Sequence, residues 1–108
     1  MGGYLQSVVG TGFSLPMRVA VDGSGNIYIA DAGNQRVVKE TLSAGVYTQS
    51  VVASSGLNGP SGVAVDGSGN VYIADVFNNR VLKETLSAGG YTESTVESSS
   101  LIAPMELR

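Results

Sequence analysis

The sequence contains no cysteine and no histidine, and these two absences exclude several kinds of chemistry. Without cysteine, the chain has neither a disulfide framework nor thiolate ligands for a metal ion. Without histidine, it lacks the commonest general base of enzymes and the commonest metal ligand. We therefore expect a protein that is not an enzyme and that carries no metal and no cofactor.

Charged residues and long apolar runs are scarce as well. Charged residues make up 14% of the 108 positions, and the net charge of −3 disfavours nucleic acid and an anionic membrane surface as partners. No apolar run approaches the about 18 residues that a transmembrane helix needs. Hydrophobic residues reach 43%, however, which is enough for a folded domain with a modest core.

The clearest positive feature is an internal repeat. Residues 63–75 read VAVDGSGNVYIAD, and residues 19–31, which begin 44 positions earlier, read VAVDGSGNIYIAD. In each copy, β-branched and aromatic residues, which suit a pleated backbone, flank a turn built from Asp, Gly, Ser and Asn. Gly and Asn also accept the positive φ of a tight reversal. The pattern predicts a β-hairpin in each repeat.

Each hairpin is followed by two more strand candidates. Residues 36–42 and 80–86 predict a third strand, and the segments that start at Tyr47 and Tyr91 predict a fourth. A short helix over residues 37–44 is the alternative, because Lys-Glu-Thr-Leu has reasonable helix propensity. That segment lacks an apolar stripe of helical period and lies between turn residues, so we favour strands. Each repeat then has four short antiparallel strands.

The outer segment occurs a third time, near the N-terminus. Residues 4–9 (YLQSVV) match residues 47–52 (YTQSVV) and 91–96 (YTESTV). Proline suits the start of a strand rather than its middle. Prolines recur at a spacing of 44 positions, as Pro16, Pro60 and Pro104.

A period in the forties with four strands per unit is typical of β-propeller blades, so the predicted fold class is all-β. The prolines mark the predicted division of the chain. It has an extra outer strand and loop at 1–15, a first blade at 16–59, a second blade at 60–103 and a C-terminal stub at 104–108.

The blocks GPSGVAVDGSGNVYIAD (59–75) and NNRVLK (78–83) closely resemble NHL repeats, and the resemblance covers nearly the whole chain. It implies a β-propeller, most often six-bladed, that serves chiefly as a binding platform. Family members with lyase or hydrolase activity place metal-binding His or acidic residues in the central channel, and RNA-binding members use a basic face. This sequence has no histidine to match the former and no basic pattern to match the latter.

Two blades cannot close a ring, because propellers use about four to eight. An isolated pair of blades would expose apolar faces and unpaired strand edges. We therefore predict a homo-oligomer, in which three chains close a six-bladed ring with threefold symmetry through head-to-tail interfaces.

In such a ring, residues 4–9 of one chain and residues 91–96 of its neighbour compete for the outer place on one blade. Val8 and Val9 are more apolar than Thr95 and Val96, so we predict that the N-terminal segment wins and displaces the residues after about position 97. The alternative is that the C-terminal copy keeps its place and residues 1–10 stay loose.

A set of polar residues recurs at the turn between the second and third strands: Asp31, Asn34, Arg36, Asp75, Asn78 and Arg80. A charge-assisted bond between carboxylate and guanidinium would lock this turn. A catalytic site is normally single, so recurrence in both repeats favours a structural role.

Positions that differ between the repeats are the binding candidates. Phe77 stands where the first repeat has Gly33, and it predicts an exposed aromatic anchor. Arg18 stands where the second repeat has Gly62, near the expected mouth of the channel. Either residue could instead be ordinary packing or surface.

Asp22 and Asp66 begin segments that space oxygen atoms like the first half of a calcium loop. Neither segment has the glutamate at position 12 that an EF-hand loop needs, so a plain hairpin turn is favoured. We predict a non-enzymatic NHL-type unit that assembles with itself and binds a protein or peptide. The alternatives are a structural or engineered fragment without a ligand, and an enzyme with a metal held by these two aspartates.

Overall fold

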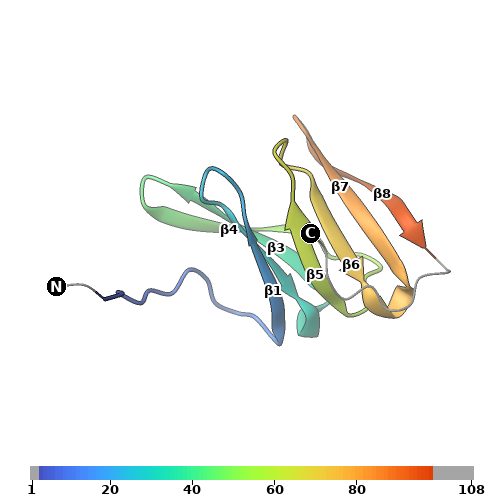
Figure 1. Ribbon diagram of the computed structural model, residues 1–108, viewed down its shortest axis with the longest axis horizontal. Helices are drawn as coiled ribbons and strands as arrows, with labels where there is room; N and C mark the ends of the chain where they lie inside the picture. The colour runs from blue at the N-terminus through green and yellow to red at the C-terminus, as the bar shows by residue number, and fades with distance from the viewer. Residues whose placement is uncertain (1–2, 99–108) are drawn as a thin grey trace.

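The structure, a computed structural model, describes residues 3–98 and consists of two four-stranded antiparallel sheets, one for each sequence repeat (Figure 1). The predicted pair of four-stranded blades is thereby confirmed. In both sheets the strands follow one another in sequence order. The first blade comprises β1 (Pro16–Val21), β2 (Ile27–Asp31), β3 (Arg36–Ser43) and β4 (Val46–Ala53). The second comprises β5 (Pro60–Val65), β6 (Val71–Asp75), β7 (Arg80–Ser87) and β8 (Gly90–Ser98).

The turns form for the reasons that their residues suggest. The β1–β2 reversal is closed by a bond from Asp22 N to Asn26 O of 3.0 Å, and Gly25 adopts a positive φ of 85° there. Two short 3₁₀ turns, η1 (Ala32–Asn34) and η2 (Val76–Asn78), join the second strand of each blade to the third. The third strand of the first blade is β3, so the alternative of a helix over residues 37–44 is wrong. Of the described residues, none belongs to a helix that is long and apolar enough to cross a membrane.

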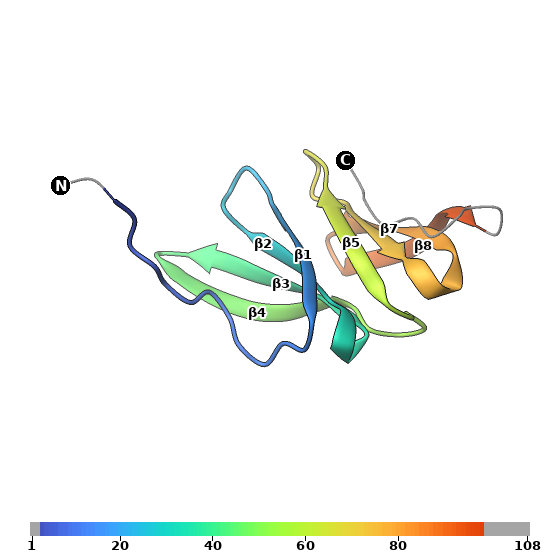
Figure 2. The same ribbon diagram turned by 60° about the horizontal axis from the view of Figure 1, so that its bottom comes forward.

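The two blades pack face to face, and the core lies between them (Figure 2). We call the two surfaces of a blade its front and rear faces. The front face carries Val19, Ile29 and Val38 in the first blade, and Val63, Ile73 and Leu82 in the second. The rear face carries Tyr28, Ala30 and Val37 in the first blade, and Tyr72, Ala74 and Val81 in the second. The rear face of the first blade contacts the front face of the second, and we call this interface the seam.

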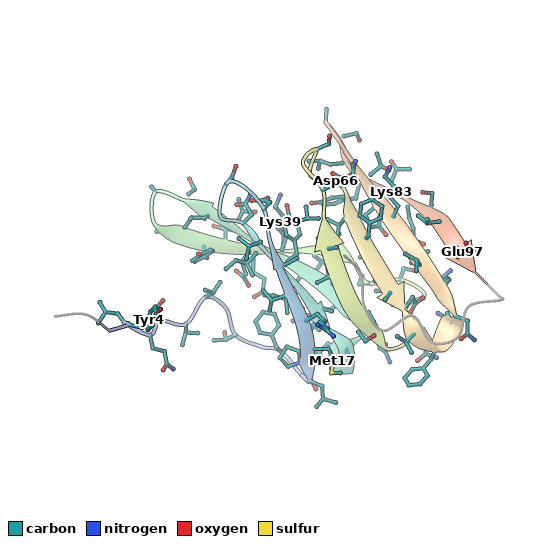
Figure 3. All side chains as sticks on the ribbon, viewed as in Figure 1. Tyr4, Met17, Lys39, Asp66, Lys83 and Glu97 are labelled. Atoms are coloured by element: carbon teal, nitrogen blue, oxygen red, sulfur yellow. The ribbon has the colours of Figure 1, made fainter. Side chains whose placement is uncertain are left out.

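The N-terminal segment forms no strand in the single chain, and the expectation that residues 4–9 form an outer strand on a neighbouring copy stays a prediction. Residues 3–15 pair with no strand, and Tyr4 lies away from both sheets (Figure 3). In the single chain β8 is hydrogen-bonded to β7 up to Ser98, and the displacement expected in a ring after about position 97 stays a prediction. A strand needs an edge to pair with, and in one chain the outer edge of the second blade is already occupied by its own β8. Residues 99–108, including the predicted stub, lie outside the described residues.

Candidate functional site

A buried aspartate organises the end of each blade at which the 3₁₀ turn lies. In the first blade, Asp31 Oδ2 accepts hydrogen bonds from Arg36 Nε at 2.7 Å and from Asn34 Nδ2 at 2.9 Å. Its Oδ1 accepts a bond from the backbone N–H of Ser14 at 2.7 Å. Burial raises the pKa of Asp31, but the bonds from Asn34, Arg36 and Ser14 together hold it below its usual value. The carboxylate therefore ties the turn to the loop that precedes the blade.

The second blade repeats this arrangement. Asp75 Oδ2 accepts bonds from Arg80 Nε and Asn78 Nδ2, both at 2.8 Å, and Asp75 Oδ1 accepts a bond from Asn58 N at 2.7 Å. The structure thus brings the predicted residues together in two groups of three. In each group a loop carbonyl, that of Gly12 or Gly56, also accepts bonds from the asparagine and arginine side chains. Sequence reasoning missed these two glycines, although they too lie 44 positions apart.

The carboxylate oxygens of the two hairpin-turn aspartates accept hydrogen bonds from residues of their own hairpins. The two oxygens of Asp22 accept bonds from Ser24 N, Asn26 N, Asn26 Nδ2 and the Tyr28 hydroxyl, at 2.8–3.0 Å. Burial raises the pKa of Asp22, and these bonds lower it further than burial raises it. Asp66 has the same four partners in its own turn. Among residues 3–98 no group of three or more acidic side chains is placed to hold a metal ion.

The NHL repeat profile matches residues 13–39 and 57–83, which together make up half of the chain. The chain belongs to the NHL repeat family. Each match runs from the loop before a blade, through the hairpin and the aspartate network, into the third strand of that blade. No curated protein matches the chain significantly.

Between the two NHL repeats lies a groove of about 540 Å³, at the end of the seam where the 3₁₀ turns are. Its apolar wall is formed by Leu15 and Met17 from the first repeat and by Val76 and Phe77 from the second. Met17 is half-exposed on β1 (Figure 3), and the Phe77 side chain is 71% exposed. Phe77 packs on Gly59, where a Cβ atom would collide with the ring. The predicted aromatic candidate therefore lines this groove.

Two polar side chains line the same groove. The Ser61 hydroxyl has no hydrogen-bond partner, and the residue is only 8% exposed. Gln35 reaches across the seam, where its Oε1 accepts a bond of 2.7 Å from Gly59 N. The other predicted candidate, Arg18, is exposed on β1 opposite Ala30 and is not part of the groove lining. Leu15, Met17, Gln35 and Ser61 were missed from sequence, although all four stand at positions where the two repeats differ.

Each NHL repeat also buries a glutamate in its third strand. Glu84 is 3% exposed, its Oε2 has no hydrogen-bond partner, and it lies directly opposite Glu93 of β8. Burial, a side-chain hydrogen bond with Glu93 and repulsion from the Glu93 charge raise the pKa of Glu84 to about 7. Burial likewise raises the pKa of Glu40 in the first repeat, but the residue opposite Glu40 is the neutral Gln49. Only the second blade therefore places two carboxyl groups against each other.

Proposed function

We propose that this protein is a non-enzymatic NHL-type propeller unit that assembles with copies of itself into a closed ring and serves there as a binding scaffold. One observation carries the assembly. Val19 and Val63 occupy the same position in their blades, yet Val19 is 61% exposed and Val63 is 7% exposed. The difference arises because the first blade covers the front face of the second, whereas no blade covers the front face of the first.

A second copy of this chain is the occupant that fits the exposed part of the front face, which is formed by Val19 and Val21; Ile29 and Val38 of the same face are already buried within the chain. The rear face of the second blade carries Tyr72, Ala74 and Val81, which correspond to Tyr28, Ala30 and Val37 at the seam. A neighbouring copy can thus repeat the internal seam, and burying the exposed parts of Val19 and Val21 there would contribute about 1–2 kcal/mol for each side chain. The contact is head-to-tail, so three copies would close a ring of six blades.

We also propose that residues 4–9 of each copy complete the second blade of its neighbour. The loop before β1 is fixed to the first blade as the β4–β5 loop is fixed to the second, by bonds from Gly33 N to Ser14 O (2.8 Å) and from Phe77 N to Asn58 O (3.0 Å). The chain before Ser14 is therefore directed as β4 is, toward the outer edge of a preceding blade.

The pairing register and the charges along β7 both favour this exchange of strands. Val96 is an extra residue in the β7–β8 pairing, because Val81 and Leu82 face Glu97 and Thr95. Between its tyrosine and the next proline, the N-terminal segment has one residue fewer than the segment that begins at Tyr91. It would therefore pair with β7 without this bulge. That register places Gln6 opposite Glu84, where Glu93 stands now. A neutral amide would then replace a carboxylate beside a buried carboxyl group.

The mass of the protein in solution tests the assembly. Light scattering after size-exclusion chromatography should give three times the mass of the chain, and Val19→Asp should reduce it because a charge on the front face cannot be buried unpaired. Val46→Asp, at the exposed β3–β4 hairpin, is the matched control and should leave the mass unchanged. A compact monomer at every concentration would contradict the ring.

The strand exchange has its own test. Gln6→Glu restores the like-charge pair opposite Glu84 and should shift the assembly toward smaller species above pH 7, while Gln49→Glu in β4 should not affect the exchanged strand. An unchanged mass distribution for Gln6→Glu would show that β8 keeps its place in the ring.

A further inference from the structure

The outer strand of the second blade, β8, carries a charge where the equivalent strand of the first blade does not. Glu93 of β8 lies directly opposite Glu84, whereas Gln49 of β4 lies directly opposite Glu40. Glu40 is 1% exposed and Glu84 is 3% exposed, and each has an Oε2 atom without a hydrogen-bond partner. An amide can donate a hydrogen bond to an ionised carboxylate, but a second carboxylate can only accept one. The two blades therefore differ in how well they tolerate ionisation of the same buried group.

The other groups near Glu84 do not neutralise it. The charged and titratable groups on the elements packed against it come from β8 and from the first blade: Glu93, Tyr91, Tyr28, Lys39 and Asp22. Lys39 Nζ lies 5.5 Å from the centre of the Tyr28 ring, and among residues 3–98 no ion pair joins Lys39 to either glutamate. The residue of β6 opposite Glu84 is the apolar Val71. An ionised Glu84 is therefore left without a cationic partner.

The N-terminal segment is a closer copy of β4 than β8 is. Residues 4–9 (YLQSVV) differ from residues 47–52 (YTQSVV) at one position, whereas residues 91–96 (YTESTV) differ from them at two. One of those two differences is the glutamate at position 93. In the register proposed above, Gln6 would stand beside Glu84 as Gln49 stands beside Glu40. Residues 4–9 pair with no strand of their own chain, so they are available to another copy.

We propose that β8 is a proton-controlled strap over the edge of β7, and that residues 4–9 of a second copy replace it when it is released. With Glu84 protonated, its hydroxyl donates a hydrogen bond to the Glu93 carboxylate and holds β8 in place. Loss of that proton to water leaves two carboxylates opposite each other, which weakens the pairing of β7 with β8. The vacated edge then accepts a strand whose amide donates to the ionised Glu84. The inference rests on the proposed strand exchange and adds the group that regulates it.

The direction and range of the pH dependence follow from proton linkage. The pKa of Glu84 is about 7 while β8 is paired, and release of β8 returns it toward the ordinary 4.5, because the cover and the opposing charge are removed together. The paired state holds the proton more tightly, so pairing is favoured at low pH and is lost as the pH rises through about 7. Release should increase by up to about tenfold per pH unit between about pH 5 and pH 7, and then level off.

The test is hydrogen–deuterium exchange of the two outer strands at pH 5 and pH 8, read by mass spectrometry. Each rate is divided by the rate of the unstructured peptide at the same pH, so that only protection is compared. We expect β8 to lose about tenfold or more of its protection at pH 8, while β4 changes much less. Equal changes in β8 and β4 would overturn the proposal.

Two variants should exchange the behaviour of the strands. Glu93→Gln gives β8 the residue of β4 and should reduce the pH dependence of β8 to that of β4. Gln49→Glu gives β4 the residue of β8 and should make β4 lose protection at pH 8. Thr92→Ser, on the other face of β8, is the control and should change neither strand. If β8 kept its full pH dependence in Glu93→Gln, the carboxyl pair would not control it.

The identity of the replacing strand has its own probe, a capped peptide with the sequence of residues 3–10, titrated into the protein. It should bind at least about tenfold more tightly at pH 8 than at pH 5, and the peptide with Gln6→Glu should bind more weakly at pH 8. Equal affinity at the two pH values would show that the peptide does not take the place of β8.

Light scattering on the same samples separates the strap from the ring. A protein that is monomeric at both pH values but releases β8 at pH 8 supports the strap and contradicts the ring. A trimer in which β8 is protected as well as β4 at both pH values contradicts the strap and leaves the ring standing.

Discussion

Replacing Glu84 with glutamine should stabilise the protein at neutral and alkaline pH. The side chain is 3% exposed and faces Glu93, and these surroundings raise its pKa from 4.5 to about 7. A shift of that size corresponds to about 3 kcal/mol by which the folded protein disfavours the ionised form. Glutamine has nearly the same shape as the protonated acid and does not ionise, so it removes this cost.

The sign of the pH dependence follows from the direction of the shift. The folded state binds the proton more tightly than the unfolded state, so the contribution of Glu84 is fully present below about pH 4.5. It is lost as the pH rises through about 7. The parent protein should therefore lose stability between pH 5 and pH 8, and Glu84→Gln should lose much less.

The assay is urea unfolding followed by circular dichroism at pH 5 and pH 8. The chain concentration is held constant, because assembly adds to the apparent stability. Glu93→Gln should recover a smaller part of the stability, since it removes the like charge and leaves the burial. Glu97→Gln, an exposed glutamate of the same strand, is the control. If Glu84→Gln showed the same difference between the two pH values as the parent, the carboxyl group would not be buried as described.

The aspartate network gives two further predictions. Arg80→Ala should lower the free energy of unfolding by about 1–3 kcal/mol, because it leaves the buried Asp75 carboxylate short of a donor; Arg80→Lys, which keeps the charge, separates charge from geometry in the same thermal melts. Asp31 has a lowered pKa, so its contribution is present above its ordinary pKa near 4 and is lost as the pH falls below that. Asp31→Asn should be less stable at pH 7 and should flatten the acid limb of the unfolding curve, and an unchanged limb would show that another group controls it.

Local features of the sequence predicted the blades well, because each strand is specified within its own repeat. Pro16 begins β1, the turn from Asp22 closes the hairpin, and residues 36–42 lie within β3. The groove could not be predicted in the same way. Leu15 and Ser61 are 46 positions apart, and they line one hollow only because two sheets pack at a particular angle. The only sequence signal for the groove was the difference between the two repeats. That signal indicated both Phe77, which lines the groove, and Arg18, which does not.

The N-terminal segment shows a different limit. Residues 4–9 carry the pattern of an outer strand but form none in a single chain, since a strand exists only where an edge is open to it. The sequence pattern indicates that the segment is able to form a strand. Whether it forms one depends on whether an unpaired strand edge is available.

The groove lies within one chain rather than between chains, which fixes how often it occurs. A trimeric ring would carry three identical grooves in threefold symmetry, alternating with three seams of different lining. A partner with several groove-binding segments on a flexible linker could then engage more than one groove at once, with the second contact strengthened by effective concentration. The scaffold would be trivalent, and its selectivity would depend on the spacing of residues in the partner as well as on their chemistry.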